Sequence, residues 1–496
     1  MNYHGKKMSR DATASQRRVL DWPRSWLPAT LDPAQILVFS FAAVIAIGTL
    51  LLMLPAASTS GASLRFVDAF FTIVSATCVT GLAVVDTGSA FTTFGQMVIL
   101  GCIQIGGLGF MTFTTVFLVA LGKRLTIADR VLIQESFHHS PTGKLSTLII
   151  YIFSATALTE LVGTLLLAKW WLEQGIYAEF GDAFYSAAFH AISAFCNAGF
   201  GLFPGNLIRF QRDAFTQLVI SALIIVGGLG FLTGLDLKEY LQQRLFIRFW
   251  PKAARQRVER MRPRPRLSLH TKFAVVTTVA LLVIGTVSFY ILERNGVFAS
   301  MSAAHAWLNA WFCSVTPRTA GFNTIDYGQM SGPALLCTIV LMFIGGSPGS
   351  AAGGVKTTTF GLLIIYALFR WRGHESPHAF NRSIPQATLD KATAVIVLAV
   401  GVIVVAVSAL LAAEGRAGSA AQSQARFLPL LFEGFSSFGT VGLSMGITPK
   451  LTDAGKLILC GLMFVGRIGP ATVAMAVGTR KVQAKYRYAE ENVMVG

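Results

Sequence analysis

The chain has 496 residues, of which 53% are hydrophobic and only 13% charged, and its formal net charge is +17. Soluble domains carry about 25% charged residues, so this composition excludes an ordinary soluble domain. A membrane-spanning helix needs about 20 apolar residues, and such stretches recur along the whole chain. They are residues 36–54, 97–121, 148–171, 218–235, 273–291, 334–344 with 359–368, 392–412 and 457–477. We therefore predict a polytopic membrane protein whose first apolar stretch is a retained helix.

The basic residues alternate in density between successive connections of these apolar stretches. They gather in the N-terminal tail, in 123–144, in 244–272, in 370–391 and after Thr479, with poorly basic connections between them. By the positive-inside rule, both termini and all the basic loops are cytosolic. Contact with membrane lipids or a cytosolic partner is favoured over nucleic acid. The six cysteines stand singly, which is typical of small buried side chains rather than of disulfides or metal sites.

A repeated motif organises the chain. The strings "SATCVTGL", "SAFCNAGF", "VTPRTAGF" and "SSFGTVGL" place glycines at Gly81, Gly199, Gly321 and Gly442. The spacing is roughly 120 residues each time, and a fixed period indicates a repeat architecture. An aromatic residue lies ten positions before each glycine, and a further string ("IGGLGF", "VGGLGF", "IGGSPG", "VGRIGP") follows at a similar distance.

We read each unit as a spanning helix, a short half-helix, a glycine-bearing strand and a second spanning helix. Non-helical backbone at membrane depth is tolerated only inside protein or along a water-filled cavity. The predicted fold is therefore an all-α polytopic membrane protein with four pseudo-symmetric helix–pore-loop–helix repeats around a central ion pore, with eight spanning helices and four re-entrant half-helices. The predicted boundaries are tail 1–30, repeat 31–125, repeat 145–247, basic linker 248–268, repeat 269–372, repeat 386–480 and tail 481–496.

The four glycine-bearing strands are predicted to form a cation filter. Glycine adopts positive φ without a Cβ penalty, and rings of backbone carbonyls can replace the hydration shell of a cation. The strands lack carboxylates, which favours a monovalent ion, potassium first, over a divalent ion or a proton. The alternative is that these glycines only permit tight helix packing. The predicted filter residues are Val79, Thr80, Gly81, Asn197, Ala198, Gly199, Thr319, Ala320, Gly321, Thr440, Val441 and Gly442.

Two carboxylates follow the strands of the first and third repeats at the same distance. Asp86 and Asp326 each lie five residues beyond their glycine. If the repeats run in order around the axis, the two acids face each other and concentrate cations at an outer mouth. The alternative is that both are ordinary loop acids that cap a helix or turn.

The third repeat contains a break in its second helix, "IGGSPGSAAGGVKTTTF". Glycine costs about 1 kcal/mol and proline about 3 kcal/mol inside a helix, so this segment is predicted to be non-helical near mid-membrane. Such a break below a filter is a candidate gate. Its near match to a phosphate-binding loop misses the required spacing and follows no strand. The predicted gate residues are Gly345, Gly346, Ser347, Pro348, Gly349, Ser350, Gly353, Gly354, Lys356 and Arg467.

Arg467 replaces a glycine of the repeated string in an apolar stretch, where a charge costs at least about 2.5–3.5 kcal/mol. Its guanidinium donors can bind carbonyls and hydroxyls of the Gly345–Gly354 segment and hold it across the pore. A fixed positive charge there also opposes the passage of cations. The alternative is a structural arginine paired with a buried acid, either Glu433 or Glu160.

The strings "SVTPRTAGFNTID", "IGGSPGSAAGGVKTTTF", "SAFCNAGF" and "LMFVGRIGPATVA" resemble the Trk/Ktr/HKT superfamily of potassium transporters. "GRIGP" and "NAGF" are most similar to the KtrB-type membrane subunits of bacterial Ktr potassium uptake systems. The resemblance covers about residues 31–480 and implies one filter glycine per repeat, a gating loop at Gly345–Thr357 and an arginine below the filter at Arg467. Because serine at the first filter glycine accompanies sodium permeation in this family, Gly81 favours potassium.

The resemblance also implies a bacterial plasma-membrane protein that forms a homodimer and binds a cytosolic, nucleotide-binding RCK ring (KtrA-like). Potassium is then the substrate and sodium a possible modulator, with no organic cofactor in this chain. The main alternative is a Trk-type subunit with looser potassium/sodium selectivity. A membrane enzyme is disfavoured because no convergent nucleophiles, metal ligands or paired acids occur. A non-conducting receptor or scaffold subunit is separable only by a flux measurement.

Overall fold

The structure is a computed structural model that describes residues 33–108, 145–249, 267–374, 377–415, 420–470 and 472–473. These residues are almost all helical. Their only sheet is a two-stranded hairpin of β1 (His378–Ala379) and β2 (Arg382–Ser383). The predicted tails and most of the predicted linker 248–268 lie outside the described residues.

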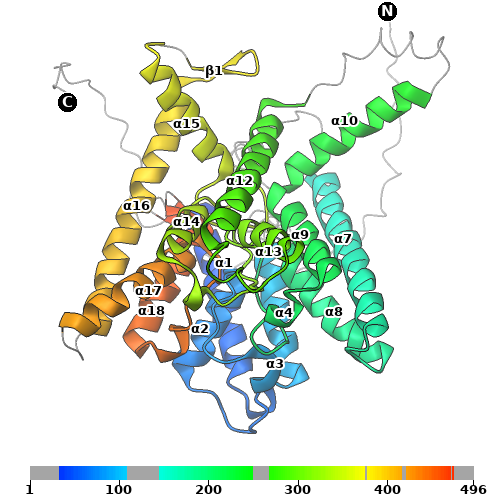
Figure 1. Cartoon of the computed structure of the whole chain (residues 1–496), viewed down its shortest axis with the longest axis vertical. Coiled ribbons are helices and arrows are strands. Elements are labelled where there is room, and N and C mark those ends of the chain that lie inside the picture. Colours follow the sequence, from blue (N-terminus) through cyan, green and yellow to red (C-terminus); the bar gives the residue numbers. More distant parts are fainter. Residues whose placement is uncertain are drawn as a thin grey trace, which may run out of the picture.

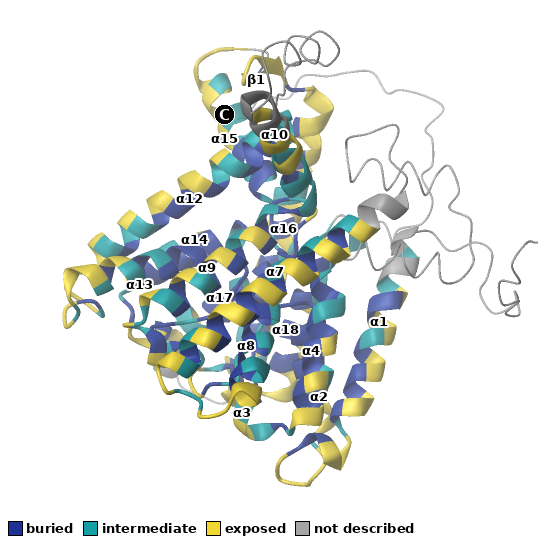
Figure 2. Ribbon diagram, turned by 90° about the vertical axis from the view of Figure 1, so that its right-hand side faces the viewer, coloured by how far each residue is buried: buried dark blue, intermediate teal, exposed yellow. Residues whose placement is uncertain are grey.

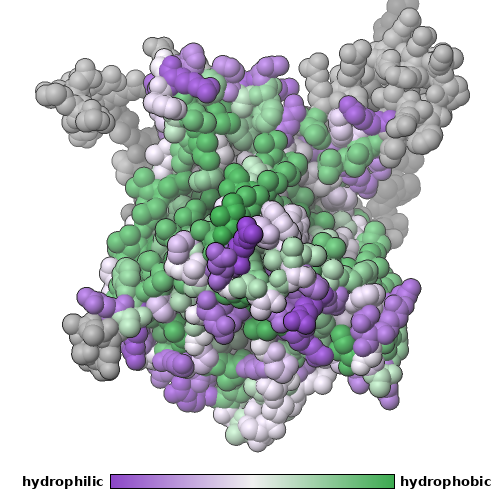
Figure 3. Space-filling model, viewed as in Figure 1, coloured by the Kyte–Doolittle hydropathy of each residue, from purple (hydrophilic) through white to green (hydrophobic). Residues whose placement is uncertain are grey.

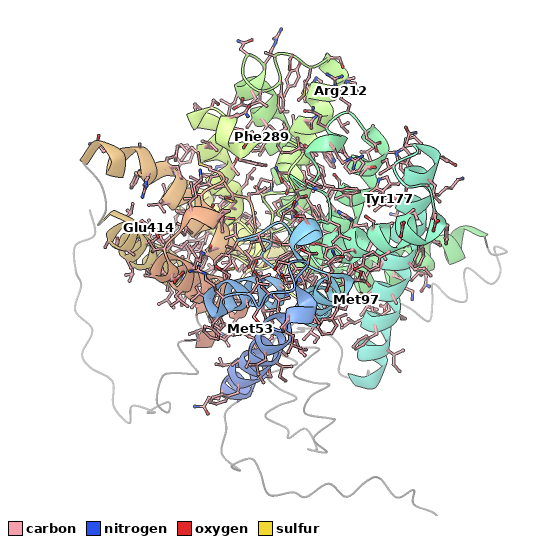
Figure 4. The ribbon with its side chains drawn as sticks, turned by 90° about the horizontal axis from the view of Figure 1, so that it is seen from below. Met53, Met97, Tyr177, Arg212, Phe289 and Glu414 are labelled. Carbon is pink, nitrogen blue, oxygen red and sulfur yellow. The ribbon has the colours of Figure 1, made fainter. Side chains whose placement is uncertain are left out.

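The described part of the chain contains four repeats of one helical order, as predicted. The first helices are α1 (Pro33–Leu52), α7 (Leu145–Glu173), α12 (Leu269–Glu293) and α16 (Gln386–Glu414). The half-helices are α2 (Phe66–Thr77), α8 (Phe180–Phe195), α13 (Ala303–Val315) and α17 (Ala420–Gly439). The second helices are α4 (Thr93–Gly107), α9 (Ala214–Leu229), α14 (Gly332–Phe343) and α18 (Asp453–Ile468). All four repeats surround a common centre, as Met53, Tyr177, Phe289 and Glu414, one from each repeat, show in the view from below (Figure 4).

Two ends of the molecule differ in what they carry. The short helix α3 (Thr87–Ala90) lies at one end, which we call the α3 side (Figure 1). The β-hairpin, α10 (Phe231–Phe249) and α15 (Thr357–Trp371) lie at the opposite end, which we call the α15 side. Between them the surface is mainly hydrophobic, with hydrophilic patches nearer both ends (Figure 3).

The outward faces of the first helices are exposed and apolar (Figure 2). Ile284 of α12 is 62% exposed and Val405 of α16 is 71% exposed. Apolar patches of this extent mark contact with a partner or a membrane. By length and composition, helices over Ile150–Glu173, Leu269–Glu293 and Gln386–Glu414 can cross a bilayer. A fourth candidate span is the bent pair Ala214–Leu229 with Phe231–Gln242.

The second helices break more often than the sequence predicted. The predicted break in the third repeat is present, since α14 ends at Phe343, but breaks in two other repeats were not predicted. α9 ends at Leu229, and the chain turns by 98° into α10. α18 ends at Ile468. Gly230 (φ 89°) and Gly469 (φ 94°) occupy the same place in their strings, and this backbone conformation is open to glycine but incompatible with a helix.

One half-helix is longer than predicted. α17 has 20 residues and contains Pro429, whereas the other three have between 12 and 16. Alanine, glutamine, arginine and leucine precede the aromatic motif in this repeat, and they are good helix formers that extend the helix toward its N-terminus. The second helix predicted for the first repeat, 97–121, is described only up to Leu108.

Buried acids join the first and second helices of the third and fourth repeats. Glu293, at the end of α12, accepts a hydrogen bond from the backbone N of Ser331, 2.8 Å away at the start of α14. Glu414, at the end of α16, accepts one from Thr452 N, also at 2.8 Å, at the start of α18. Hydrogen bonds to charged groups contribute about 1.5–3 kcal/mol each. These carboxylates therefore fix the second helix against the first in the third and fourth repeats.

The candidate ion pathway

In each repeat, the residue two positions before the repeated glycine has a left-handed backbone conformation. These residues are Val79 (φ 58°), Asn197 (φ 59°), Thr319 (φ 72°) and Thr440 (φ 49°). The glycines, which we call the ring glycines, also have positive φ: Gly81 (92°), Gly199 (72°), Gly321 (74°) and Gly442 (92°). Positive φ at a non-glycine residue costs on the order of 1–3 kcal/mol. The same unfavourable turn is therefore imposed once in every repeat.

The ring glycines form a closed cycle of contacts. Each packs against the carbonyl oxygen that precedes the ring glycine of the next repeat, so closely that an added Cβ would lie under 3.0 Å from it. The pairs are Gly81 with Ala198, Gly199 with Ala320, Gly321 with Val441, and Gly442 with Thr80. The repeats consequently run in sequence order around one axis. The first and third repeats stand opposite each other, and so do the second and fourth.

One backbone amide in each strand is hydrogen-bonded to the half-helix of the same repeat and not to a neighbouring strand. In each repeat the residue before the ring glycine donates its N–H to a carbonyl at the end of its own half-helix. The bonds are Thr80 to Ser75 (2.7 Å), Ala198 to Ser193 (2.7 Å), Ala320 to Thr316 (3.0 Å) and Val441 to Ser436 (2.8 Å). Within the described ranges, no donor reaches the carbonyl oxygens of these same four residues. Four free acceptors are thus held in a ring.

The electrostatic surroundings of the ring favour a cation. None of the twelve predicted filter residues has a charged side chain. All four half-helices end beside the ring, at Thr77, Phe195, Val315 and Gly439. The C-terminus of a helix carries a partial negative charge of about half an electron, which attracts cations.

The two predicted mouth acids are both exposed, Asp86 directly before α3 and Asp326 directly before the short helix Tyr327–Gln329. Asp86 precedes α3, and partial burial of its carboxyl raises the pKa above its ordinary value. Asp326 accepts hydrogen bonds from Gly328 N (2.9 Å) and Gln329 Nε2 (3.1 Å), so it caps a short turn. The two acids belong to repeats that stand opposite each other, which the predicted outer mouth requires. Asp326 caps a turn, which is the role that the alternative assigns to it.

The broken helix of the third repeat gives a non-helical segment, Ile344–Lys356, which we call the linker. It is folded on itself by Gly345 N to Val355 O (2.8 Å) and by Thr357 N to Gly346 O (3.0 Å). The hydroxyl of Ser347 bonds to that of Thr357, and Ser350 Oγ donates to Ser347 O at 2.6 Å. Left-handed turns at Gly349 (φ 69°) and Gly354 (φ 65°) make this path possible.

The linker is attached to the second repeat along one edge. Ser347 N donates to Gly228 O at 2.9 Å, and Ala351 N donates to Gly227 O at 3.2 Å. Phe231 N donates to Gly349 O at 3.0 Å, and Pro348 O lies against Gly230. These acceptors and donors exist because α9 breaks at Gly230, so the unpredicted break creates the docking edge.

On its other edge the linker meets the fourth repeat. Gly353 lies so close to the side chain of Thr440, a predicted filter residue, that a Cβ there would overlap the Thr440 hydroxyl. Arg467 of α18 donates from Nη1 to the carbonyl oxygen of Ala351. The linker belongs to the third repeat, so these bonds and contacts join it to the two repeats that flank its own.

Arg467 also binds the first repeat, which the sequence analysis did not predict. Its Nη2 donates to the carbonyl oxygen of Gly106, at the end of α4. The guanidinium is 6% exposed and forms no ion pair with any described residue. Glu433 bonds to Ser444 and Thr448, and Glu160 bonds to Gln104 and Cys196. The alternative of an Arg467–carboxylate pair therefore has no counterpart in the described structure.

Lys356 and Arg318 are two further positively charged side chains of the third repeat. Lys356, a predicted gate residue, donates from Nζ to Ala352 O at 2.8 Å within the linker. Arg318 was not singled out from the sequence, although it stands in the string "VTPRTAGF". It is 5% exposed and donates from Nη2 to Thr278 Oγ1 at 3.3 Å. The signal that revealed Arg467, a charge inside an apolar repeat motif, applies equally to Arg318.

A ring of four pore-loop repeats with unbonded carbonyl oxygens between neighbouring strands is an arrangement able to bind a cation, as membrane cation transporters must. Comparison with known families agrees with that class. The family model TrkH, described as a cation transport protein, matches residues 12–486. The chain belongs to the TrkH family of cation transport proteins. Members of this family are transporters and not enzymes.

Relatives of known name extend over nearly the whole chain. The Ktr system potassium uptake protein B of Bacillus subtilis is 39% identical over 486 residues, covering 98% of this chain and 100% of the relative. The potassium/sodium uptake protein NtpJ of Enterococcus hirae is 37% identical, covering 94% and 98%. The Ktr system potassium uptake protein B of Vibrio alginolyticus is 35% identical, covering 93% and 94%.

The fold also has a solved counterpart. The potassium transporter TrkH from Vibrio parahaemolyticus superposes with a TM-score of 0.64 at 18% sequence identity, covering 90% of this chain and 85% of that one. This match confirms the predicted fold class of helix–pore-loop–helix repeats.

Proposed function

We propose that this chain carries out potassium-selective uptake across a bacterial plasma membrane. The observation that carries the proposal is the closed cycle of ring glycines with four free carbonyl oxygens between them. Such oxygens can replace the hydration shell of a potassium ion. Three relatives named for potassium uptake, at 35% identity or more over nearly their whole length, support potassium as the substrate.

In this proposal the twelve predicted filter residues are the selectivity filter, and Asp86 with Asp326 forms the outer mouth. The α3 side then faces outward, and the α15 side with both termini faces the cytosol. The basic residues of 244–272 and 370–391 support this orientation, because cytosolic loops carry an excess of lysine and arginine.

The linker and Arg467 act as the gate. A segment that crosses the axis next to Thr440 blocks the path of an ion leaving the filter, and Arg467 holds it there through the Ala351 carbonyl. Opening requires these contacts to break. In a Ktr-like system the trigger is a cytosolic nucleotide-binding ring bound to a homodimer of this chain. The names of two relatives as Ktr system proteins support such an assembly.

The second candidate is potassium and sodium uptake with loose selectivity. It is favoured by one relative, which is named for both ions. The two candidates differ in a single measurable quantity, the concentration of sodium needed to compete with potassium.

The test is uptake of radioactive rubidium into proteoliposomes that contain the purified chain, competed with potassium and with sodium. Block by potassium but not by sodium supports the first candidate, and equal block supports the second. Gly81→Ser should reduce the preference for potassium, because its Cβ overlaps the Ala198 carbonyl. The matched control is Gly101→Ser, since Gly101 lies in α4 with open space around it. An unchanged preference in Gly81→Ser would contradict the filter assignment.

A further inference from the structure

Two wholly buried titratable side chains stand at one register of the half-helices. The register lies nine residues before the ring glycines and is occupied by Thr72, His190, Phe312 and Glu433 in the four repeats. His190 and Glu433 are both 0% exposed. They belong to the second and fourth repeats, which stand opposite each other around the ring.

Glu433 ties its half-helix to the segment that follows the fourth strand. Its Oε1 accepts hydrogen bonds from the hydroxyls of Ser444 and, at 3.0 Å, Thr448. Ser444 lies two residues beyond ring glycine Gly442, and its Oγ also accepts from Gly446 N at 2.9 Å. Hydrogen bonds to a carboxyl group are stronger than neutral ones. The carboxyl therefore fixes the end of the strand that leaves the ring.

His190 does the same in the second repeat with different chemistry. Its Nδ1 lies 2.7 Å from the carbonyl oxygen of Ser186, so Nδ1 must donate. Its Nε2 is then free to accept the N–H of Leu202, at 3.2 Å. Leu202 lies three residues beyond ring glycine Gly199. The carbonyl of Leu202 in turn packs against Gly88 of the first repeat, leaving no room for a Cβ there.

The other two repeats lack this connection. Thr72 donates its hydroxyl to Asp68 O at 2.8 Å, within its own helix, and Phe312 is apolar. Phe312 shows that an apolar side chain can fill this register in the core, so the fold does not require a titratable group there. The Glu433 carboxyl also leaves Oε2 without a hydrogen-bond partner in the described part of the chain. A buried polar atom left unpaired is destabilising, so packing alone does not account for an acid at this position.

We propose that Glu433 and His190 are positioning residues for ion selectivity. They hold the ends of two opposite strands against their half-helices and so keep the ring carbonyls from closing onto an ion smaller than potassium. Neither side chain touches the ion, and each acts through its strand. This inference rests on the proposed function of the ring as the filter.

The experiment measures the ratio of sodium to potassium needed to block rubidium uptake by the full chain in proteoliposomes. Glu433→Leu removes both hydrogen bonds, and the preference for potassium should fall roughly tenfold, which corresponds to about 1.4 kcal/mol. Glu433→Gln keeps an acceptor oxygen and should preserve the preference. Thr72→Val, at the same register of the first repeat, is the matched control and should leave the ratio unchanged. His190→Leu and His190→Gln repeat the comparison in the second repeat.

If Glu433→Leu does not fold, a double substitution of its hydrogen-bond partners tests the positioning role instead. Ser444→Ala combined with Thr448→Val removes the donors and leaves Glu433 in place, and it should lower the preference as Glu433→Leu would. Lower total uptake with an unchanged sodium-to-potassium ratio overturns the inference, because it is the result of a merely structural role. Gly442→Ala separates the two proposals. If it alters the ratio and Glu433→Leu does not, only the positioning role fails; if neither alters the ratio, the filter assignment fails as well.

Discussion

The ring and the linker meet where Gly353 packs against Thr440, yet they are built in opposite ways. The ring is made of four equivalent strands, each with the same two left-handed residues and the same contact with the next repeat. The linker comes from the third repeat alone, and its contacts reach Gly227 and Gly228 in the second repeat and Thr440 and Arg467 in the fourth.

The difference separates a feature that all four repeats share from a feature that one repeat alone provides. A ring of identical carbonyls requires symmetry, because every repeat must present an oxygen at the same distance from the ion. A gate must break that symmetry, since one segment has to cross the axis while the others leave room for it. Pro348 and Arg467 are two departures from the repeated string, and both lie at the linker.

The largest effect is expected from removing the linker while keeping the ring. Deletion of Ser347–Gly353 eliminates the bonds to Gly227, Gly228 and Arg467 and clears the axis. We expect rubidium uptake by the chain alone to rise at least roughly tenfold, since one lost bond of about 1.4 kcal/mol changes an equilibrium tenfold. The preference for potassium should stay the same. A folded deletion variant with less uptake than the parent would refute the gate.

A smaller effect is expected from Arg467, which connects the linker to the first repeat. Arg467→Ala removes two charge-assisted bonds of about 1.5–3 kcal/mol each and should raise uptake, though less than the deletion, because the bonds to the second repeat remain. Arg467→Lys should give an intermediate rise, since one ammonium cannot span both carbonyls in the fork geometry of a guanidinium. Equal uptake for all three side chains would show that Arg467 does not hold the gate.

The smallest effect is expected at the contact between Gly353 of the linker and Thr440 of the fourth strand. Gly353→Ala places a Cβ against the Thr440 hydroxyl and should move the linker or the fourth strand, changing uptake and the potassium preference by about threefold or less, as for a difference under 1 kcal/mol. Gly349→Ala is the matched control, because it adds backbone strain (φ 69°) but meets no neighbouring atom. If both variants behave alike, the contact between linker and ring has no functional role.

Several features of the fold could be predicted from sequence because their causes are local. The membrane class follows from composition, the repeats follow from the spacing of Gly81, Gly199, Gly321 and Gly442, and the broken helix of the third repeat follows from its glycines and Pro348. The breaks at Gly230 and Gly469 were missed, because a single glycine in an apolar stretch is compatible with a helix as well as with a turn. His190, Glu433 and Arg318 were visible as polar residues in apolar motifs, but their partners were not.

The sequence by itself determined the class of protein, the number of repeats and the residues on which a filter and a gate can be built. Only the tertiary structure decided that the repeats close in order, that the linker docks on the opposite pair of repeats and that Arg467 binds both Ala351 and Gly106. The reason is physical. Composition and backbone preference act within a few residues, whereas Arg467 and Gly106 are 361 positions apart, and the bond between them exists only after the ring has closed.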